Sequence, residues 1–179
     1  GAHTGSGEEA GIAREVEALN RIFASGVGAT VMVLLETTAG QGTVLGYSFE
    51  HLARVIEQVS QRERLGICLD TCHIFAAGYD IRTPETYAAT FETFDRLVGL
   101  DMIKVFHLND SQNDLGSRLD RHAHIGQGYL GQTAFRLLVN DPRFRDVPMI
   151  IETPKGKEMT EDIENLNLLR SLRGEEKMA

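Results

Sequence analysis

The sequence predicts an α/β fold in which strands and helices alternate and the strands form a parallel sheet. Four short apolar runs rich in β-branched residues recur at steps of about 35 to 45 residues, with helix-like stretches between them. The runs are apolar on both faces, as expected of strands that are buried on both sides. Each run ends in a side chain able to bind a metal ion or move a proton.

The expected elements follow one another from the amino end. A helix over residues 8–25 has apolar side chains three or four residues apart. Ser48 caps a helix that ends at residue 59. Thr83 and Pro84 open one that runs to about residue 98. The remaining helices are expected at 132–139 and 160–172, and the strands at 29–35, 65–69, 102–106 and 147–151.

The side chains that end the four strands decide between two parallel architectures. They are Glu36, Asp70, His107 and Glu152. An open doubly wound sheet places its chemistry at one switch point, whereas a βα-barrel places it at the carboxyl ends of all strands. We therefore expect a βα-barrel. A complete barrel has eight strands and typically about 250 residues. Residues 1–179 are thus expected to be a single domain with four to five βα units, the C-terminal half of a barrel from a longer protein.

Composition and charge exclude several classes of protein. The chain is 42% hydrophobic and has 2 Cys, which excludes a disordered protein and a disulfide scaffold. No apolar run approaches about 18 residues and no secretory leader is visible, so we expect a cytoplasmic protein without a membrane partner. The formal net charge of −8 opposes nucleic-acid binding. Divalent cations held by the carboxylates would weaken that objection.

The densest group of reactive residues runs from Cys68 to His73. Asp70 ends a strand and His73 follows three residues later in the expected loop, which brings a carboxylate and an imidazole together at the barrel mouth. Both side chains suit zinc or manganese. The alternative is that Asp70 caps the next segment and His73 is an ordinary loop residue. Cys68 and Cys72 are expected to be small buried thiols, because no second cysteine pair accompanies them.

A long loop over residues 111–128, rich in Asp, Asn and Gly, follows the third strand. Long ordered loops in compact domains are often functional. Asp120 and His122 lie on the same side of an extended chain. Together with His73 they could form a three-ligand site with an open position, as catalytic zinc requires.

Other polar residues are expected to have ordinary roles. Asn109 and Asp110 are typical of a turn, His51 of a helix surface and His124 of a loop. The glycine-rich loop after Glu36 lacks the lysine of a phosphate-binding loop, and Glu36 itself is better placed as a bridging carboxylate.

Eight candidate metal ligands remain, four carboxylates and four imidazoles. They are His3, Glu36, Asp70, His73, His107, Asp120, His122 and Glu152. His3 indicates nothing by itself. A set of this size at strand ends is typical of a multi-metal hydrolase, in which neighbouring cations clamp the attacking and leaving oxygens of phosphoryl transfer.

Several of these motifs resemble those of the endonuclease IV family, the zinc-dependent apurinic/apyrimidinic endonucleases of base excision repair. The similarity covers the chain from His3 to about Leu172, in order and with family-like spacing. The motifs that carry it are Cys68 to His73, His107 to Asp110, Gly116 to His122, Glu36 to Gly42 and Ile151 to Thr153.

The resemblance implies a TIM-type barrel with three zinc ions at its mouth, where manganese would also suit some sites. It implies hydrolysis of the phosphodiester 5′ to an abasic site in double-stranded DNA. His3 would hold the first zinc, with Glu36 bridging it to the second. Glu36 or Glu152 would handle the proton of the attacking hydroxide. The second zinc would be held by Asp70, His107 and Glu152, and the third by His73, Asp120 and His122.

The chain also departs from the family pattern. The N-terminal part of the barrel, about three and a half strands in that family, is absent, and with it one expected histidine ligand. Gln112 stands where lysine is usual, Gly7 where another histidine is usual and Thr37 where asparagine is usual.

Two alternative functions and the oligomeric state remain open. One is a sugar isomerase of the related xylose-isomerase-like barrels, which would not need Asp120 and His122 beside His73. The other is a non-catalytic, metal-binding remnant of a truncated gene.

Overall fold

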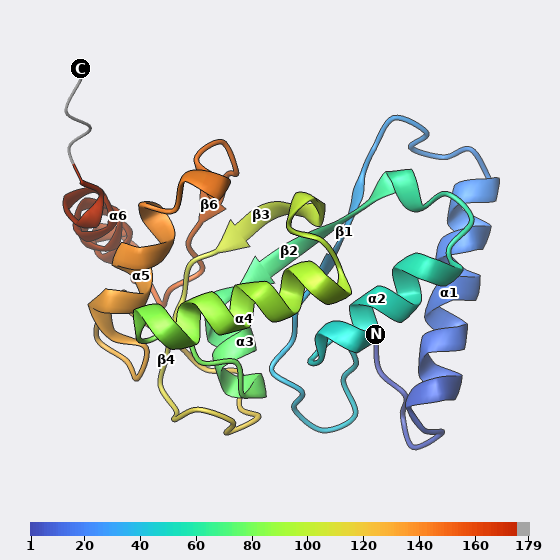
Figure 1. The fold of residues 1–179 in the computed structure, drawn as a ribbon, viewed down its shortest axis with the longest axis horizontal. Coiled ribbons are helices and arrows are strands. Elements are labelled where there is room, and N and C mark those ends of the chain that lie inside the picture. Colours follow the sequence, from blue (N-terminus) through green and yellow to red (C-terminus); the bar gives the residue numbers. More distant parts are fainter. Residues whose placement is uncertain (175–179) are drawn as a thin grey trace.

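A parallel sheet organises the molecule, which is described by a computed structural model over residues 1–174. Its strands lie side by side in the order β1-β2-β3-β6 (Figure 1). They span Val33–Glu36, Leu65–Asp70, Ile103–His107 and Met149–Ile150. The four strands that the sequence predicts are therefore present, in chain order across the sheet. Each crossover between neighbours contains a helix, as parallel strands require.

The register places the carboxyl ends of the strands close to level. Glu36 in β1 pairs with Cys68 in β2, and Asp70 in β2 pairs with His107 in β3. His107 in turn pairs with Ile150 in β6. Side chains that end neighbouring strands are thus brought to one edge of the sheet, where a barrel has its mouth.

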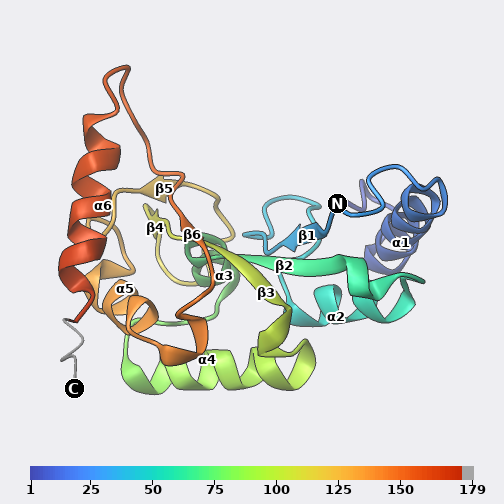
Figure 2. The ribbon, with the colours of Figure 1, turned by 90° about the horizontal axis from the view of Figure 1, so that it is seen from above.

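Helices cover one side of this sheet. Figure 2 shows α2, α4 and α5 along the same side, with α1 and α6 toward the two ends. The helices are α1 (Glu8–Ala24), α2 (Phe49–Gln58), α3 (Thr71–Ala77), α4 (Pro84–Leu97), α5 (Gly131–Val139) and α6 (Thr160–Leu172). Single 3₁₀ turns occur at Arg62–Arg64, Leu100–Met102 and Pro142–Phe144.

The core fills the layer between the sheet and these helices. Phe91 of α4 and Phe106 of β3 both pack against Phe144, with ring centroids 5.1 Å and 4.9 Å away. All three rings are buried. Burying large aromatic side chains is the main contribution such residues make to stability, and here they fix α4 and the 3₁₀ turn Pro142–Phe144 against β3.

The sheet is an incomplete barrel. Within residues 1–174, β1 and β6 each pair with one neighbouring strand, so the sheet does not close on itself. This matches the half-barrel that the sequence predicts. No helix in the described part of the chain is long and apolar enough to cross a membrane.

Three local features differ from the expectations. The first strand begins at Val33 instead of residue 29, because residues 25–30 form turns in which Gly26 and Gly28 have positive φ. A short helix, α3, follows β2 where a loop was expected. The long loop contains an antiparallel pair, β4 (Asp110–Ser111) with β5 (His122–Ala123).

Candidate metal centre

The first cluster, which we name the strand-end group, comprises Glu36, Asp70, His107 and Glu152. One donor atom from each lies within 4.8 Å of the others. His107 Nδ1 is 3.1 Å from Glu36 Oε1 and 3.1 Å from Glu152 Oε2. The imidazole therefore lies between two carboxylates, and the mixed oxygen and nitrogen donors suit a divalent cation such as zinc or manganese.

Asp70 is the most deeply buried member of this group. Its side chain is 0% exposed, and burial raises the pKa of its carboxyl against the opposing charges of His73 and His122. Its Oδ1 accepts a hydrogen bond of 3.0 Å from the main-chain N–H of His73. Asp70 is thus the N-cap of α3, the role that the sequence offered as the alternative. The capping oxygen leaves Oδ2 directed into the cluster, so the two roles coexist.

The second cluster, which we name the two-histidine group, comprises Asp70, His73 and His122. His73 lies in the first turn of α3 and not in a loop, and His122 lies in β5. The two Nε2 atoms are 3.4 Å apart. Asp120 Oδ1 lies 3.2 Å from Nε2 of His73 and 3.3 Å from Nε2 of His122. The three residues that the sequence pointed to are thus brought together, with Asp70 shared between the groups.

Main-chain carbonyls fix the ring protons of both histidines. His73 Nδ1 is 2.7 Å from the main-chain carbonyl oxygen of Thr37, and His122 Nδ1 is 3.1 Å from the main-chain carbonyl oxygen of Glu152. A carbonyl oxygen only accepts, so each Nδ1 carries a proton and each neutral ring presents a lone pair at Nε2. Two lone pairs and the Asp120 carboxylate then converge on one point. Such an arrangement repels itself unless a cation sits there, and carbonyl-oriented histidines are the usual support of metal ligands.

The electrostatics of His73 lead to the same conclusion. Burial lowers its pKa, but the negative charges of Asp70 and Asp120 outweigh burial, and the pKa is raised overall. The position beside Nε2 therefore attracts positive charge, whether as a proton or as a metal ion.

Asn109 links the two groups, and the expectation that it merely forms a turn is wrong. It is fully buried. Its amide Nδ2 donates to Asp70 Oδ2 at 2.6 Å, and its Oδ1 accepts from the main-chain N–H of Glu152 at 2.8 Å. Thr71 Oγ1 fixes the Asn109 backbone. Only its position two residues beyond His107 hinted at this role.

Asp110 closes the long loop instead of forming a simple turn. Its carboxylate accepts hydrogen bonds from the main-chain N–H groups of Ser111, Gly128, Leu130 and Gly131, at 2.7 to 3.2 Å. Because all of these donors are main-chain N–H groups, the role of Asp110 is structural. It attaches the long loop, which contains Asp120 and His122, to the sheet.

Two other histidines differ from the strand-end pattern. His51 was expected on a helix surface, but the residue is only 6% exposed. Its ring packs between Tyr47 and α1, with Nε2 3.3 Å from Glu8 Oε2. His3 belongs to neither ligand group among residues 1–174. Its main chain pairs with Thr43, and its Nδ1 accepts from the Gly5 N–H. Its expected role in holding a first zinc stays a prediction.

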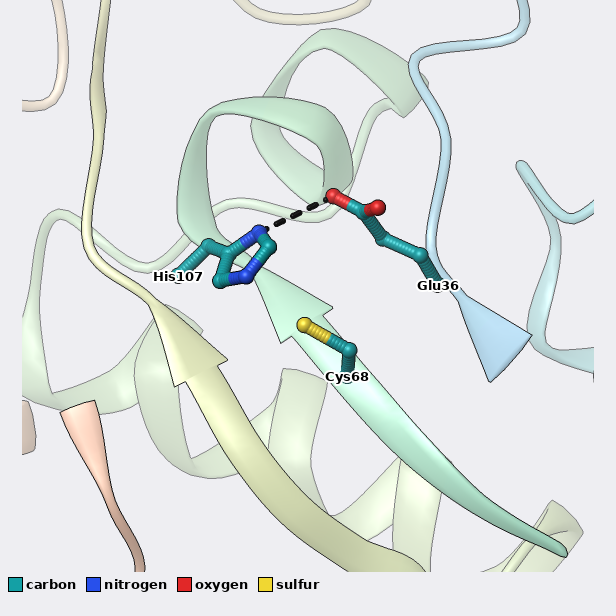
Figure 3. Close-up of side chains that lie close together, drawn as sticks. All are labelled: Glu36, Cys68 and His107. Atoms are coloured by element: carbon teal, nitrogen blue, oxygen red, sulfur yellow. Dashed lines mark hydrogen bonds and ion pairs between the residues drawn. The ribbon is translucent and has the colours of Figure 1, made fainter. Parts of the chain in front are cut away.

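Both cysteines are buried free thiols, as expected. Burial, with the nearby charges of Glu36, Asp70 and Glu152, raises the pKa of Cys68 to about 12. Figure 3 shows Cys68 on β2 beside Glu36 and His107, whose hydrogen bond is drawn. The thiol lies on the face of β2 that carries Asp70, as the two-residue period of a strand dictates.

Comparison with known proteins agrees with the fold. Residues 1–172 match the family described as "Xylose isomerase-like TIM barrel". The chain is 70% identical over 172 residues to a "Probable endonuclease 4" of Chloroflexus aggregans. It is 71% identical over 172 residues to that of Chloroflexus aurantiacus. Both alignments cover 96% of this chain and 60% of the relative, so the chain spans about three fifths of their length.

A solved structure gives the same picture. The crystal structure of endonuclease IV from Thermus thermophilus superimposes with a TM-score of 0.77 at 41% sequence identity, over 90% of this chain and 57% of that one. An open parallel sheet with ligand-type side chains at its carboxyl edge is what part of such a barrel provides. The chain belongs to the xylose isomerase-like TIM barrel family.

Proposed function

We propose that this chain carries the metal centre of a zinc-dependent apurinic/apyrimidinic endonuclease, which hydrolyses the phosphodiester 5′ to an abasic site in double-stranded DNA. The observation that carries the proposal is the convergence of the Nε2 lone pairs of His73 and His122 with a carboxylate oxygen of Asp120. The 70% identity to a probable endonuclease 4 supports the reaction. Acting on DNA, the protein would work in the cytoplasm.

The donor set fits the cations that the family resemblance implies. Imidazole and carboxylate are the ligands of catalytic zinc, and they also accept manganese. Glu36, Asp70, His107 and Glu152 would hold one cation, and His73, Asp120 and His122 another. A third would need His3, which the donor groups within residues 1–174 do not include. When bound, such cations supply Lewis-acid stabilisation of phosphate charge and a nucleophile at neutral pH.

The chain's own residues orient the ligands and move the proton. Thr37 and Glu152 hold the two imidazoles through their carbonyl oxygens. Glu36 and Glu152 are the proton acceptors we assign, because their side chains are 40% and 46% exposed and can reach a substrate. His107 Nδ1 can donate fully to only one of these carboxylates at a time, so the other is free to take a proton.

The two-histidine group also separates this function from sugar isomerisation. A two-metal isomerase site would use carboxylates and one imidazole at strand ends, which the strand-end group already provides. Such a site would not need His73 and His122 as further ligands, although carbonyl oxygens orient both rings and both face Asp120. The same feature argues against a remnant that has lost its site, since these contacts remain well formed.

An incision assay tests the proposal. The substrate is a duplex with one abasic-site analogue, labelled at the 5′ end of the damaged strand and incubated with zinc or with a chelator. The chain is assayed alone and mixed with the complementary part of the Chloroflexus aggregans relative, since it covers 60% of that protein. We expect zinc-dependent incision directly 5′ to the lesion, lost in His122→Ala and kept in His124→Ala.

His124 is the matched control because it lies in the same loop and contacts Asn165, outside both ligand groups. The endonuclease function is contradicted if the chain binds zinc but does not incise the duplex, either alone or together with the complementary part of the relative. A chain that binds no zinc contradicts the metal centre itself.

A further inference from the structure

A second donor set overlaps the strand-end group. Cys68 Sγ, a Glu36 carboxylate oxygen and a His107 ring nitrogen lie within 4.8 Å of one another. Figure 3 shows the Cys68 thiol directed from β2 toward the space between the other two side chains, which come from the flanking strands β1 and β3. The β1–β2 register explains this placement, because Cys68 pairs directly with Glu36.

The two overlapping sets differ in chemical softness. The strand-end group offers mainly carboxylate oxygen, which prefers hard and borderline cations, whereas a thiolate prefers soft ones. Glu36 and His107 are common to both sets. Cys68 precedes Asp70 by two residues on the same face of β2, so an ion bound by its sulfur would sit farther from the carboxyl edge of the sheet than one held by Asp70 and Glu152.

We propose that Glu36, Cys68 and His107 form a second site, overlapping the strand-end group, for a thiophilic divalent cation such as Cd²⁺. Binding exchanges the S–H bond of Cys68 for a sulfur–metal bond, and the thiol proton leaves to the buffer. Because the site uses Glu36 and His107, a soft ion held there displaces a harder cation from the strand-end group. A soft metal ion bound to Cys68 therefore prevents the strand-end group from binding its harder cation.

The other cysteine provides a matched control within the same segment. Cys72 is also buried and free, but its thiol contacts the Arg121 carbonyl oxygen at 3.7 Å. It belongs to no three-residue donor set among residues 1–174. Cys68 and Cys72 therefore differ in what faces the sulfur and hardly at all in burial.

Cadmium titration of the 179-residue chain tests the site through the ultraviolet charge-transfer band of a cadmium-bound thiolate. We expect a saturable band that is absent in Cys68→Ser and retained in Cys72→Ser. The Cd²⁺ dissociation constant should rise at least about tenfold in Cys68→Ser, the lower end of the losses seen when even supporting contacts of metal sites are removed. Mn²⁺ binding, followed by water proton relaxation, should be unchanged in both variants.

Three results overturn the proposal. They are a band that persists in Cys68→Ser, Cd²⁺ bound without a band, and no Cd²⁺ binding at all. Far-ultraviolet circular dichroism of each variant, together with Cys68→Ala as a second substitution, separates loss of the ligand from loss of the fold. The readout needs no DNA cleavage, so a failure of the incision assay leaves this inference standing.

Discussion

The two ligand groups share Asp70 yet differ in how firmly the protein holds them. In the two-histidine group, His73 and His122 have side chains 9% and 16% exposed, and a main-chain carbonyl fixes each ring. In the strand-end group, the two glutamates are 40% and 46% exposed. Within residues 1–174, no main-chain group is seen to hold their carboxylates. The two imidazoles are thus oriented before a cation arrives, whereas the two glutamates are held through the side chain of His107.

This difference teaches which part of the site is self-sufficient in the chain. The imidazoles of the two-histidine group come from α3 and β5, which Asp110 and Asn109 fasten to the sheet. The strand-end group lies at the open carboxyl edge, and its donor set within residues 1–174 does not include His3. We therefore expect tighter cation binding by the two-histidine group, since preorganised ligands lose less entropy on binding.

The largest effect should come from Asp70→Asn, which removes the carboxylate that both groups share. Asparagine keeps the N-cap of α3, so the fold should survive. We expect zinc affinity to fall by more than about 100-fold, beyond the roughly 10- to 100-fold scale of lost supporting contacts. Native mass spectrometry would count the zinc ions per chain, with the exposed Asp95→Asn as control. Full zinc binding by Asp70→Asn would show that Asp70 is only a cap.

A pair of substitutions separates the groups. His122→Ala should weaken the tighter zinc binding, and Glu152→Gln should weaken the other component, each by about 10- to 100-fold. Titration against a competing chelator resolves the two components. The comparison fails if Glu152→Gln removes the tighter component, because the exposed strand-end group would then be the better organised one.

Asn109→Ala should weaken both groups to a smaller extent. It deletes the hydrogen bonds to Asp70 and to the Glu152 backbone, which orient ligands without touching the cation. We expect roughly tenfold weaker zinc binding and a loss of about 1–3 kcal/mol in the free energy of unfolding, because buried partners are left unsatisfied. Calorimetry and urea unfolding measure the two effects.

Asn140→Ala is the matched control for this change. Asn140 bridges the carbonyl oxygens of Arg136 and Leu172 near the end of α5, outside both ligand groups. It should cost stability and leave zinc affinity unchanged. Equal losses of zinc affinity in both variants would show a general effect of destabilisation.

The smallest expected effect lies outside the site and concerns acid stability. Burial would raise the pKa of Asp141, but hydrogen bonds from Arg143 and Tyr87 outweigh it and hold the pKa below its usual range. A depressed folded-state pKa stabilises the fold above the unfolded value of about 3.9, and that stability is lost as the pH falls through the folded value.

Asp141→Asn should therefore unfold more easily at pH 7 and lose less additional stability on acidification. Thermal unfolding from neutral to acidic pH, with chelator present, measures this. Zinc affinity at pH 7 should match that of the unsubstituted chain, which separates acid loss of the fold from acid loss of metal. A parallel pH dependence in both proteins would show that Asp141 does not contribute.

Much of the fold could be predicted from local pattern. The helix over 160–172 was predicted with the bounds that α6 has, and the cap at Thr83 marked the start of α4. The helix α3 was missed because its seven residues are too few to show a period, and its two ends depend on Asp70 and on Gly78 in the left-handed region. Antiparallel pairing of β4 with β5 involves only two residues on each side, which leaves no alternation to detect.

What the sequence by itself determined is the set of strands and the chemistry at their ends, because both depend on residue type and on spacing along the chain. The buried roles of Asn109 and His51, the carbonyls that fix two imidazoles, and the approach of Cys68 to Glu36 and His107 were decided only by the tertiary structure. Each joins segments far apart in sequence, and their partners follow from strand register and loop closure, which no local pattern encodes.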